Sequence, residues 1–298
     1  MTISLKKALG AVLAAALLLG AAPASAAVDT ERQLDTIANA DEPWDSVLEQ
    51  LAEDDSRYMR FATHDYPTLD IAVTDLDDNG QLEVIFRTSR MSGQIVSDAK
   101  DFKKPEAYIR SMENVAGIPL GVHATIYQVT EDGTGVGQVA IKQLNGQPTK
   151  DFPDLKRLRE PHEISTETGA RLYRIHTNVR SNPTEHGSSL VPFRLLYHTV
   201  RLTDNTLYVR LDVAEEGNYS VYEEGGIESF VQTVRMDGRE ISCEEFGQSD
   251  FLREFRTYPP VRGSVNWIRC ENFRDEDFRA NVRTLLAESW YGFSYGLR

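Results

Sequence analysis

The chain has 298 residues, of which 41% are hydrophobic and 26% are charged. This is the composition of an ordinary globular protein, and it excludes intrinsic disorder, a collagen-like fibre and a many-pass membrane protein. Asp and Glu number 46 against 32 Lys and Arg, so the formal net charge is −14. Such a surface repels polyanions, and we therefore expect neither a nucleic-acid partner nor attraction to an anionic bilayer.

Residues 1–26 have the layout of a secretory signal peptide. Lys6 and Lys7 precede an apolar run of about 15 residues, which ends in the small residues Ala24-Ser25-Ala26. A membrane anchor would need about 20 apolar residues, so cleavage after Ala26 is favoured. We expect residues 27–298 to form a single exported α+β domain, free in the periplasm or the medium, with no membrane span after cleavage.

The first predicted elements are a helix and a strand pair. Trp44, Val47, Leu48 and Leu51 have the spacing of one helix face, which predicts an amphipathic helix within residues 41–64. Short apolar runs at residues 71–73 and 84–86 follow, and an acidic turn separates them. These runs predict a strand, a turn and a second strand.

From Gly121 onward the pattern indicates antiparallel sheet. Period-two alternation is interrupted by turn dipeptides such as Asp132-Gly133 and Asp237-Gly238, and residues 206–213 give the clearest strand. Apolar positions change phase between residues 191–197 and 200–202, which predicts a β-bulge near His198. Residues 91–104 and 147–166 have weak periodicity, and we expect loops there.

Two helices are predicted near the C-terminus. Ser242 with Glu245 forms a capping box, and Ile241 with Phe246 forms a hydrophobic staple, so one helix should start there. The second should cover residues 275–291 and stop at Gly292. The predicted fold class is α+β, with an antiparallel sheet-rich core, an N-terminal helix and two C-terminal helices.

The chain has two cysteines, Cys243 and Cys270. In an oxidising compartment such a pair is most simply a disulfide, which would stabilise the fold by about 3 to 4 kcal/mol. The alternatives are a metal-binding pair, which lacks the usual CxxC spacing, or two buried free thiols.

The most informative stretch lies between the first two predicted strands. Asp75, Asp77, Asn79 and Glu83 place oxygen side chains at loop positions 1, 3, 5 and 9, and Gln81 offers its carbonyl at position 7. Gly80, at position 6, allows the backbone to turn, and Ca²⁺ takes 6 to 8 such oxygen ligands. The spacing therefore predicts a Ca²⁺ site, with a solvated type I′ hairpin at Asn79-Gly80, or Mg²⁺ or another metal, as the alternatives.

An EF-hand is disfavoured because position 12 is Phe86 and a strand pattern follows. The loop resembles the strand-loop-strand calcium loops of FG-GAP and VCBS-type repeats, which place acids at the same positions. That resemblance implies side-chain ligands at Asp75, Asp77, Asn79 and Glu83 and a carbonyl ligand at Gln81. This chain departs by having Asn at position 5, Glu at position 9 and a single copy, so the resemblance implies modest affinity.

The layout is also similar to that of uncharacterised exported proteins of gut-type bacteria. These have a leading helix, a single DxDxDGxxE loop, a β-rich middle and a segment that matches residues 237–246. The resemblance spans roughly residues 42–270 and implies no particular activity.

Other candidate sites carry weaker signals. The six histidines lack zinc-site spacing; His176 and His198 could meet across a sheet, but hydrogen-bonded surface histidines are favoured. Residues 133–137 read as a hairpin tip, and residues 186–189 as a polar loop. The acidic pairs at residues 215–216, 223–224 and 244–245 are interpreted as solvated charge. Aromatic residues near polar strand faces could form a ligand platform or pack across strands: Tyr208, Tyr219, Tyr222 and Phe230.

These patterns favour an exported, acidic calcium-binding protein with a structural Ca²⁺ site. It would act as a binding or envelope-associated interaction module whose partner is an unknown extracytoplasmic protein or glycan. The alternative is a secreted or periplasmic hydrolase of glycans or peptides with a dispersed active site.

Overall fold

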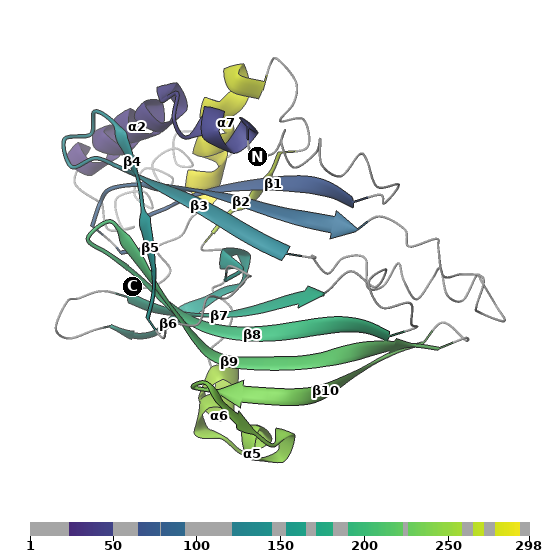
Figure 1. Ribbon diagram of the computed structural model, residues 1–298. Coiled ribbons are helices and arrows are strands. Elements are labelled where there is room, and N and C mark those ends of the chain that lie inside the picture. Colours follow the sequence, from purple (N-terminus) through teal and green to yellow (C-terminus); the bar gives the residue numbers. More distant parts are fainter. Residues whose placement is uncertain are drawn as a thin grey trace, which may run out of the picture.

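The computed structural model describes residues 24–49, 65–77, 79–92, 121–144, 153–164, 171–180, 190–222, 226–257, 265–270 and 278–292. These residues form four layers, in which two stacked β-sheets lie between two groups of helices (Figure 1). The antiparallel, sheet-rich α+β class with helices toward both ends of the chain is confirmed.

Sheet A has five strands in the order β12-β1-β2-β3-β4. Their bounds are β1 Asp65–Thr74, β2 Glu83–Ser92, β3 Gly121–Val129, β4 Val136–Gln138 and β12 Ile268–Arg269. Residues on β1 alternate between the two faces of the sheet, so Leu69, Ile71 and Val73 face the helices, whereas Asp70 faces sheet B. Sheet A is therefore covered on both sides.

Sheet B has seven strands, six of them in the order β11-β10-β9-β8-β7-β6, with β5 beside β9. Their bounds are β5 Ala140–Gln143, β6 Leu158–Ile164, β7 Arg171–Arg180, β8 Leu190–Thr203, β9 Thr206–Val221, β10 Ile227–Met236 and β11 Arg239–Ile241. The short segment from β4 to β5 passes from sheet A to sheet B, and β5 runs parallel to β9.

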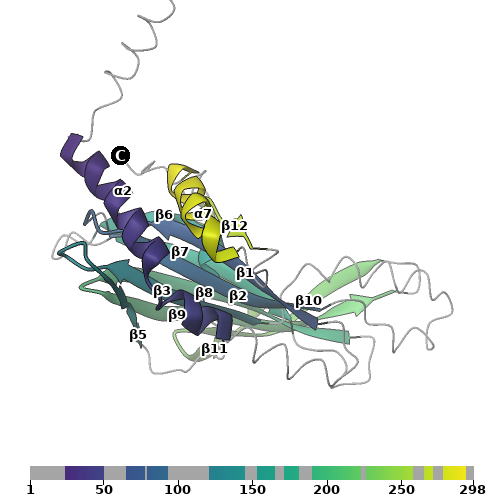
Figure 2. The same ribbon diagram turned by 90° about the horizontal axis from the view of Figure 1, so that it is seen from above.

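Helices cover the outer face of each sheet. The helix α2 Ala24–Asn39 and the helix α7 Phe278–Gly292 lie together on sheet A (Figure 2). The short helices α5 Cys243–Gly247 and α6 Asp250–Thr257 pack against sheet B, and the 3-10 turn η2 Leu155–Arg157 precedes β6. Within the described part of the chain, no helix combines the length and the apolar character that a membrane crossing requires.

Several local predictions are confirmed. Ser242 caps α5 by accepting the Glu245 N–H at 3.0 Å. Pairing of β8 with β9 passes from Tyr197↔Val213 to His198↔Leu211, so a bulge lies where it was expected and its extra residue is Asp212. The predicted helix near Trp44 is present over residues 44–49, and its remainder lies outside the described residues.

Other predictions are wrong or incomplete. Part of the expected loop at residues 147–166 is the strand β6, an edge strand on which Pro161 and a register shift are tolerated. The helix α2 was not predicted, because it overlaps the end of the signal-like segment and its buried Leu34 and Ile37 give only a short apolar pattern. The expected loop at residues 93–104 lies outside the described residues.

The expected disulfide is absent from the structure. Cys243 is exposed at the start of α5, whereas Cys270 is buried beside β1, where its N–H donates to the Leu69 carbonyl at 2.9 Å. The two thiols lie in different layers, because Cys270 is in the core between sheet A and its helices, whereas Cys243 is on α5 at the outer face of sheet B. Burial and the nearby Asp70 raise the pKa of the Cys270 thiol to about 12.

Candidate metal centre

The acidic loop occupies residues 75–82, between the last β1–β2 pair, Thr74↔Glu83. Eight residues separate the two members of this pair, whereas a type I′ turn closes a hairpin whose loop has two residues. Gly80 has φ +83°, which supports the predicted role of glycine at this position. The type I′ alternative at Asn79-Gly80 is therefore wrong.

The loop gathers three of the predicted ligands at one point. One carboxylate oxygen from each of Asp75, Asp77 and Glu83 lies within 4.8 Å of the others. Ligand oxygens lie about 2.3 to 2.6 Å from Ca²⁺, so oxygens on opposite sides of one ion are about 5 Å apart. The three oxygens thus have a spacing that one Ca²⁺ could fill.

Glu83 is the most constrained of the three. Its side chain is completely buried, and it accepts hydrogen bonds from the Leu76 N–H at 2.8 Å, the Thr74 hydroxyl at 2.9 Å and the Gln128 amide at 3.1 Å. All three donors are neutral. Burial, followed by repulsion from Asp77 and Asp75, raises the pKa of Glu83 well above its ordinary value.

Asp75 is also buried, and its carboxylate organises the turn. It accepts the Asn79 N–H at 3.0 Å and the Gly80 N–H at 3.1 Å, one on each oxygen. Asp77 accepts the side-chain amide of Asn79 at 3.0 Å. These contacts hold both carboxylates in the loop.

The remaining two predicted ligands have other contacts. The side-chain oxygen of Asn79 accepts the Gln81 N–H at 2.7 Å, and Asn79 is exposed. Gln81 lines the pocket beside the loop. The structure therefore brings Asp75, Asp77 and Glu83 together, while ligand roles for Asn79 and Gln81 stay predictions.

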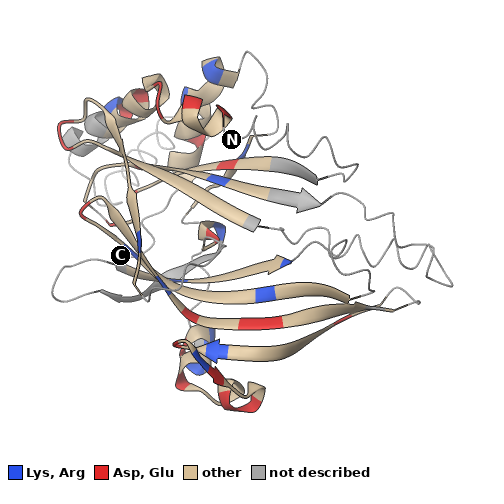
Figure 3. Cartoon of the chain, viewed as in Figure 1, with Lys and Arg blue, Asp and Glu red and all other residues tan. Residues whose placement is uncertain are grey.

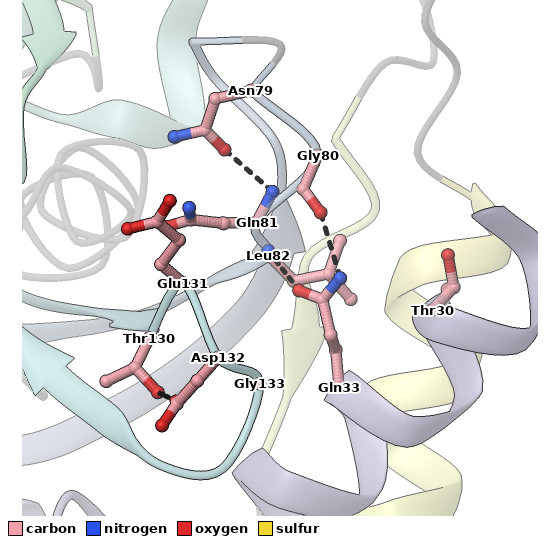
Figure 4. Close-up of a pocket in the computed structure, with 10 residues that line it drawn as sticks. All are labelled: Thr30, Gln33, Asn79, Gly80, Gln81, Leu82, Thr130, Glu131, Asp132 and Gly133. Atoms are coloured by element: carbon pink, nitrogen blue, oxygen red, sulfur yellow. Dashed lines mark hydrogen bonds between the residues drawn. The ribbon is translucent and has the colours of Figure 1, made fainter.

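Two residues far away in the sequence fix the loop from opposite sides. Gln33 on α2 donates to the Gly80 carbonyl at 2.8 Å and accepts the Leu82 N–H at 2.7 Å (Figure 4). From sheet B, the Tyr173 hydroxyl donates to the Leu76 carbonyl at 2.7 Å. Sequence reasoning missed both residues, because neither lies in a motif and each reaches the loop only through the tertiary fold.

A polar pocket of about 310 Å³ lies between α2, the acidic loop and the β3–β4 turn (Figure 4). It is lined partly by Gln33, Gln81, Glu131 and Asp132. Hydrogen bonds from Thr130 and Thr134 lower the pKa of Asp132 to about 2. The acidic character of the loop thus continues onto the neighbouring turn.

The other candidate histidines and acids do not converge. His176 and His198 are on opposite faces of sheet B: His176 stacks on Tyr197, and His198 is buried between the sheets with no hydrogen-bond partner on either ring nitrogen. The expectation of hydrogen-bonded surface histidines is therefore wrong for His198, because the β8 alternation directs it inward. Glu215 and Glu216 also point to opposite faces, as adjacent strand residues do.

The four aromatic residues do not form one platform. Tyr219 packs against Phe193 with ring centroids 4.6 Å apart, which is the cross-strand alternative. Phe230 pairs with Asn218 and therefore lies on the opposite face of sheet B from Tyr219. Glu223, Glu224 and residues 186–189 lie outside the described residues.

Comparison with known proteins gives no relative for this chain: no family model, no curated protein and no solved structure matches it.

Proposed function

We propose that the protein binds one Ca²⁺ through Asp75, Asp77 and Glu83 and that the ion stabilises a non-catalytic interaction module outside the cytoplasm. The observation that carries the calcium site is the convergence of three carboxylates, one of them completely buried. A buried carboxylate beside two others is costly unless a proton or a cation offsets its charge. Ca²⁺ provides that charge and accepts oxygen ligands at this spacing.

A structural role is favoured over a catalytic one by the surroundings of the loop. Asp75 and Glu83 are buried, and contacts from Gln33 and Tyr173 attach the loop to α2 and to sheet B. An ion held there would join three layers of the fold. With a dissociation constant of about 10⁻⁴ M and about 1 mM free Ca²⁺, binding would add about 1.4 kcal/mol to the free energy of unfolding.

The placement outside the cytoplasm rests on the signal-like segment and on the free Ca²⁺ that a weak site needs. It is tested by fractionating cells and measuring the mass of the recovered protein. A polypeptide that starts at Ala27 in the extracytoplasmic fraction is the expected result, and an uncleaved cytoplasmic chain would contradict the proposal.

The calcium site is tested by titrating Ca²⁺ into the metal-free protein in a calorimeter, which measures the heat of binding. Thermal unfolding is then measured with and without Ca²⁺. We expect one bound ion and a rise in the melting temperature of about 3 to 5 °C at millimolar Ca²⁺. Mg²⁺, which requires shorter bonds, should give a smaller rise.

Two neutral substitutions make the experiment specific. Glu83→Gln should leave the metal-free protein as stable as the parent or more stable, because it removes a buried charge, but it should abolish the response to Ca²⁺. Glu131→Gln, which removes the same charge from the neighbouring exposed turn, should retain the response. An unchanged Ca²⁺ response in Glu83→Gln, or no response in the parent, would refute the site.

A further inference from the structure

A group of basic side chains occupies one face of sheet B, the face on which Tyr208 lies. Lys142 on β5 is directly opposite Tyr208 on β9, and Tyr208 is directly opposite Arg201 on β8. Arg210 follows two residues along β9 on the same face. We call Lys142, Arg201, Tyr208 and Arg210 the basic strip.

The cations of the strip are poorly neutralised. Lys142 and Arg201 form no ion pair with any residue that the structure describes; each contacts the ring of Tyr208, at 5.8 and 5.1 Å from its centroid. Arg210 does pair with Asp212, but Asp212 also pairs with Arg174. Two further acids lie near these strands: Asp204 is at the tip of the β8–β9 hairpin, and Asp237 lies beside Asp212, whose carbonyl accepts the Asp237 N–H at 3.0 Å.

This excess of positive charge is unusual on a chain of net charge −14. Figure 3 marks basic positions on β5 and β8, and it marks acidic positions on α2, α5 and the β3–β4 turn as well as farther along β9. A surface on which two cations have no carboxylate partner among the described residues complements a negatively charged ligand.

We propose that the basic strip binds an acidic segment of a partner polypeptide. The ammonium and guanidinium groups are donors only, and the exposed side chains of Lys142 and Arg210 are open to solvent. Same-face positions on β9 are about 6.8 Å apart, which equals the separation of alternate side chains on an extended peptide. Carboxylates two residues apart in such a peptide would reach the Lys142–Arg201 row and Arg210 together.

A polypeptide fits this surface better than a membrane or a polyanionic glycan. Tyr and Arg are, with Trp, the residues most enriched at the energetic centres of protein interfaces. Leu144, which is 57% exposed, follows β5 and offers an apolar contact beside the strip. A bilayer or a long polyanion would also face the acidic remainder of the molecule, whereas a short acidic segment would not.

The test uses fluorescence anisotropy of a labelled peptide with alternating Glu and Thr, at about 50 mM salt, where surface charges are only partly screened. The double variant Lys142→Ala/Arg201→Ala should bind this peptide about tenfold more weakly than the parent protein. The control Arg235→Ala/Arg239→Ala removes two exposed cations elsewhere on the same sheet and should bind within about twofold of the parent. Both variants should keep the parent melting temperature.

An equal loss in the control would refute the site, because it would show that only net charge matters. No binding of the peptide by the parent would also refute it. So would tighter binding of alginate oligomers or of vesicles containing anionic lipid, since these would identify a glycan or a membrane as the ligand. Peptide binding should be the same in EDTA and in Ca²⁺. A failure of the basic strip to bind peptide can then be distinguished from a failure of the acidic loop to bind Ca²⁺.

Discussion

Arg87 on β2 and Asp154 before η2 form a two-point ion pair that joins sheet A to the segment leading into sheet B. The Nε–Oδ1 distance is 2.6 Å and the Nη2–Oδ2 distance is 3.1 Å. Both side chains are buried, and Arg87 also contacts Asp70 at 2.9 Å. Asp154 is held in turn by its N–H, which donates to the Thr177 hydroxyl of β7 at 2.7 Å.

Removing one partner of this pair should be costly. Asp154→Ala leaves a buried guanidinium with one carboxylate fewer, and we expect a loss of about 3 to 5 kcal/mol in the free energy of unfolding. Urea denaturation measures this loss. Asp250→Ala, which breaks the exposed pair with Arg253, should change the same quantity by less than about 1 kcal/mol. Equal effects of the two substitutions would show that the buried pair has no special role.

The contact of Gln33 with the acidic loop gives a second prediction. Gln33→Met keeps the length of the side chain but loses both hydrogen bonds, leaving the buried Leu82 N–H without its acceptor. We expect a loss of about 1 to 3 kcal/mol, together with weaker Ca²⁺ binding if the loop holds the ion. Gln248→Met, at an exposed position on the C-terminal side of α5, is the matched control and should be neutral.

Gly80 and Gly247 provide a contrast in backbone conformation. Gly80 has φ +83°, so Gly80→Ala should destabilise the protein by about 1 to 2 kcal/mol even though open space surrounds the position. Gly247, the last residue of α5, lacks positive φ and also has free space, so Gly247→Ala should be neutral or slightly stabilising. Thermal unfolding of the two variants compares them directly.

His198 predicts how stability depends on pH. Burial lowers the pKa of His198 from 6.5 to about 4, so the unfolded chain binds this proton more readily than the folded protein. The contribution of neutral His198 to the free energy of unfolding is therefore complete above pH 6.5. It declines by about 3 kcal/mol in total as the pH falls toward 4.

The variant His198→Leu isolates that contribution. It should lose less stability than the parent between pH 6.5 and 4, because the carboxylates that titrate in this range are common to both proteins. Parallel curves of unfolding free energy against pH for the two proteins would show that His198 is not a buried neutral base.

Local signals in the sequence predict local structure well in this chain. The Ser242–Glu245 cap, the Asp237-Gly238 turn and the bulge at residues 197–198 depend on residues a few positions apart, and each is confirmed. Three carboxylates of the acidic loop converge for the same reason, since they are spaced by only two to eight residues, whereas the Ca²⁺ ion itself stays a prediction.

Features that depend on distant residues could not be predicted in this way. Gln33 and Tyr173 reach the loop across 47 and 97 residues of sequence, and no local pattern marks either one. The absence of the disulfide has the same cause, because the pairing of Cys243 with Cys270 depends on the layer in which the tertiary fold places each residue. Strand β6 was missed because an edge strand does not need the apolar alternation that identifies a buried one.

The position of sheet A between the two hydrophobic cores has a consequence for how the protein unfolds. One face of sheet A contributes to the core beneath α2 and α7, and the other face contributes to the core against sheet B. Both cores therefore depend on the same strands. A rupture of sheet A would expose both hydrophobic clusters at the same moment. The layers should therefore melt together in one cooperative transition, and the backbone amides of β1 and β2 should be among the last to exchange their hydrogens for deuterium.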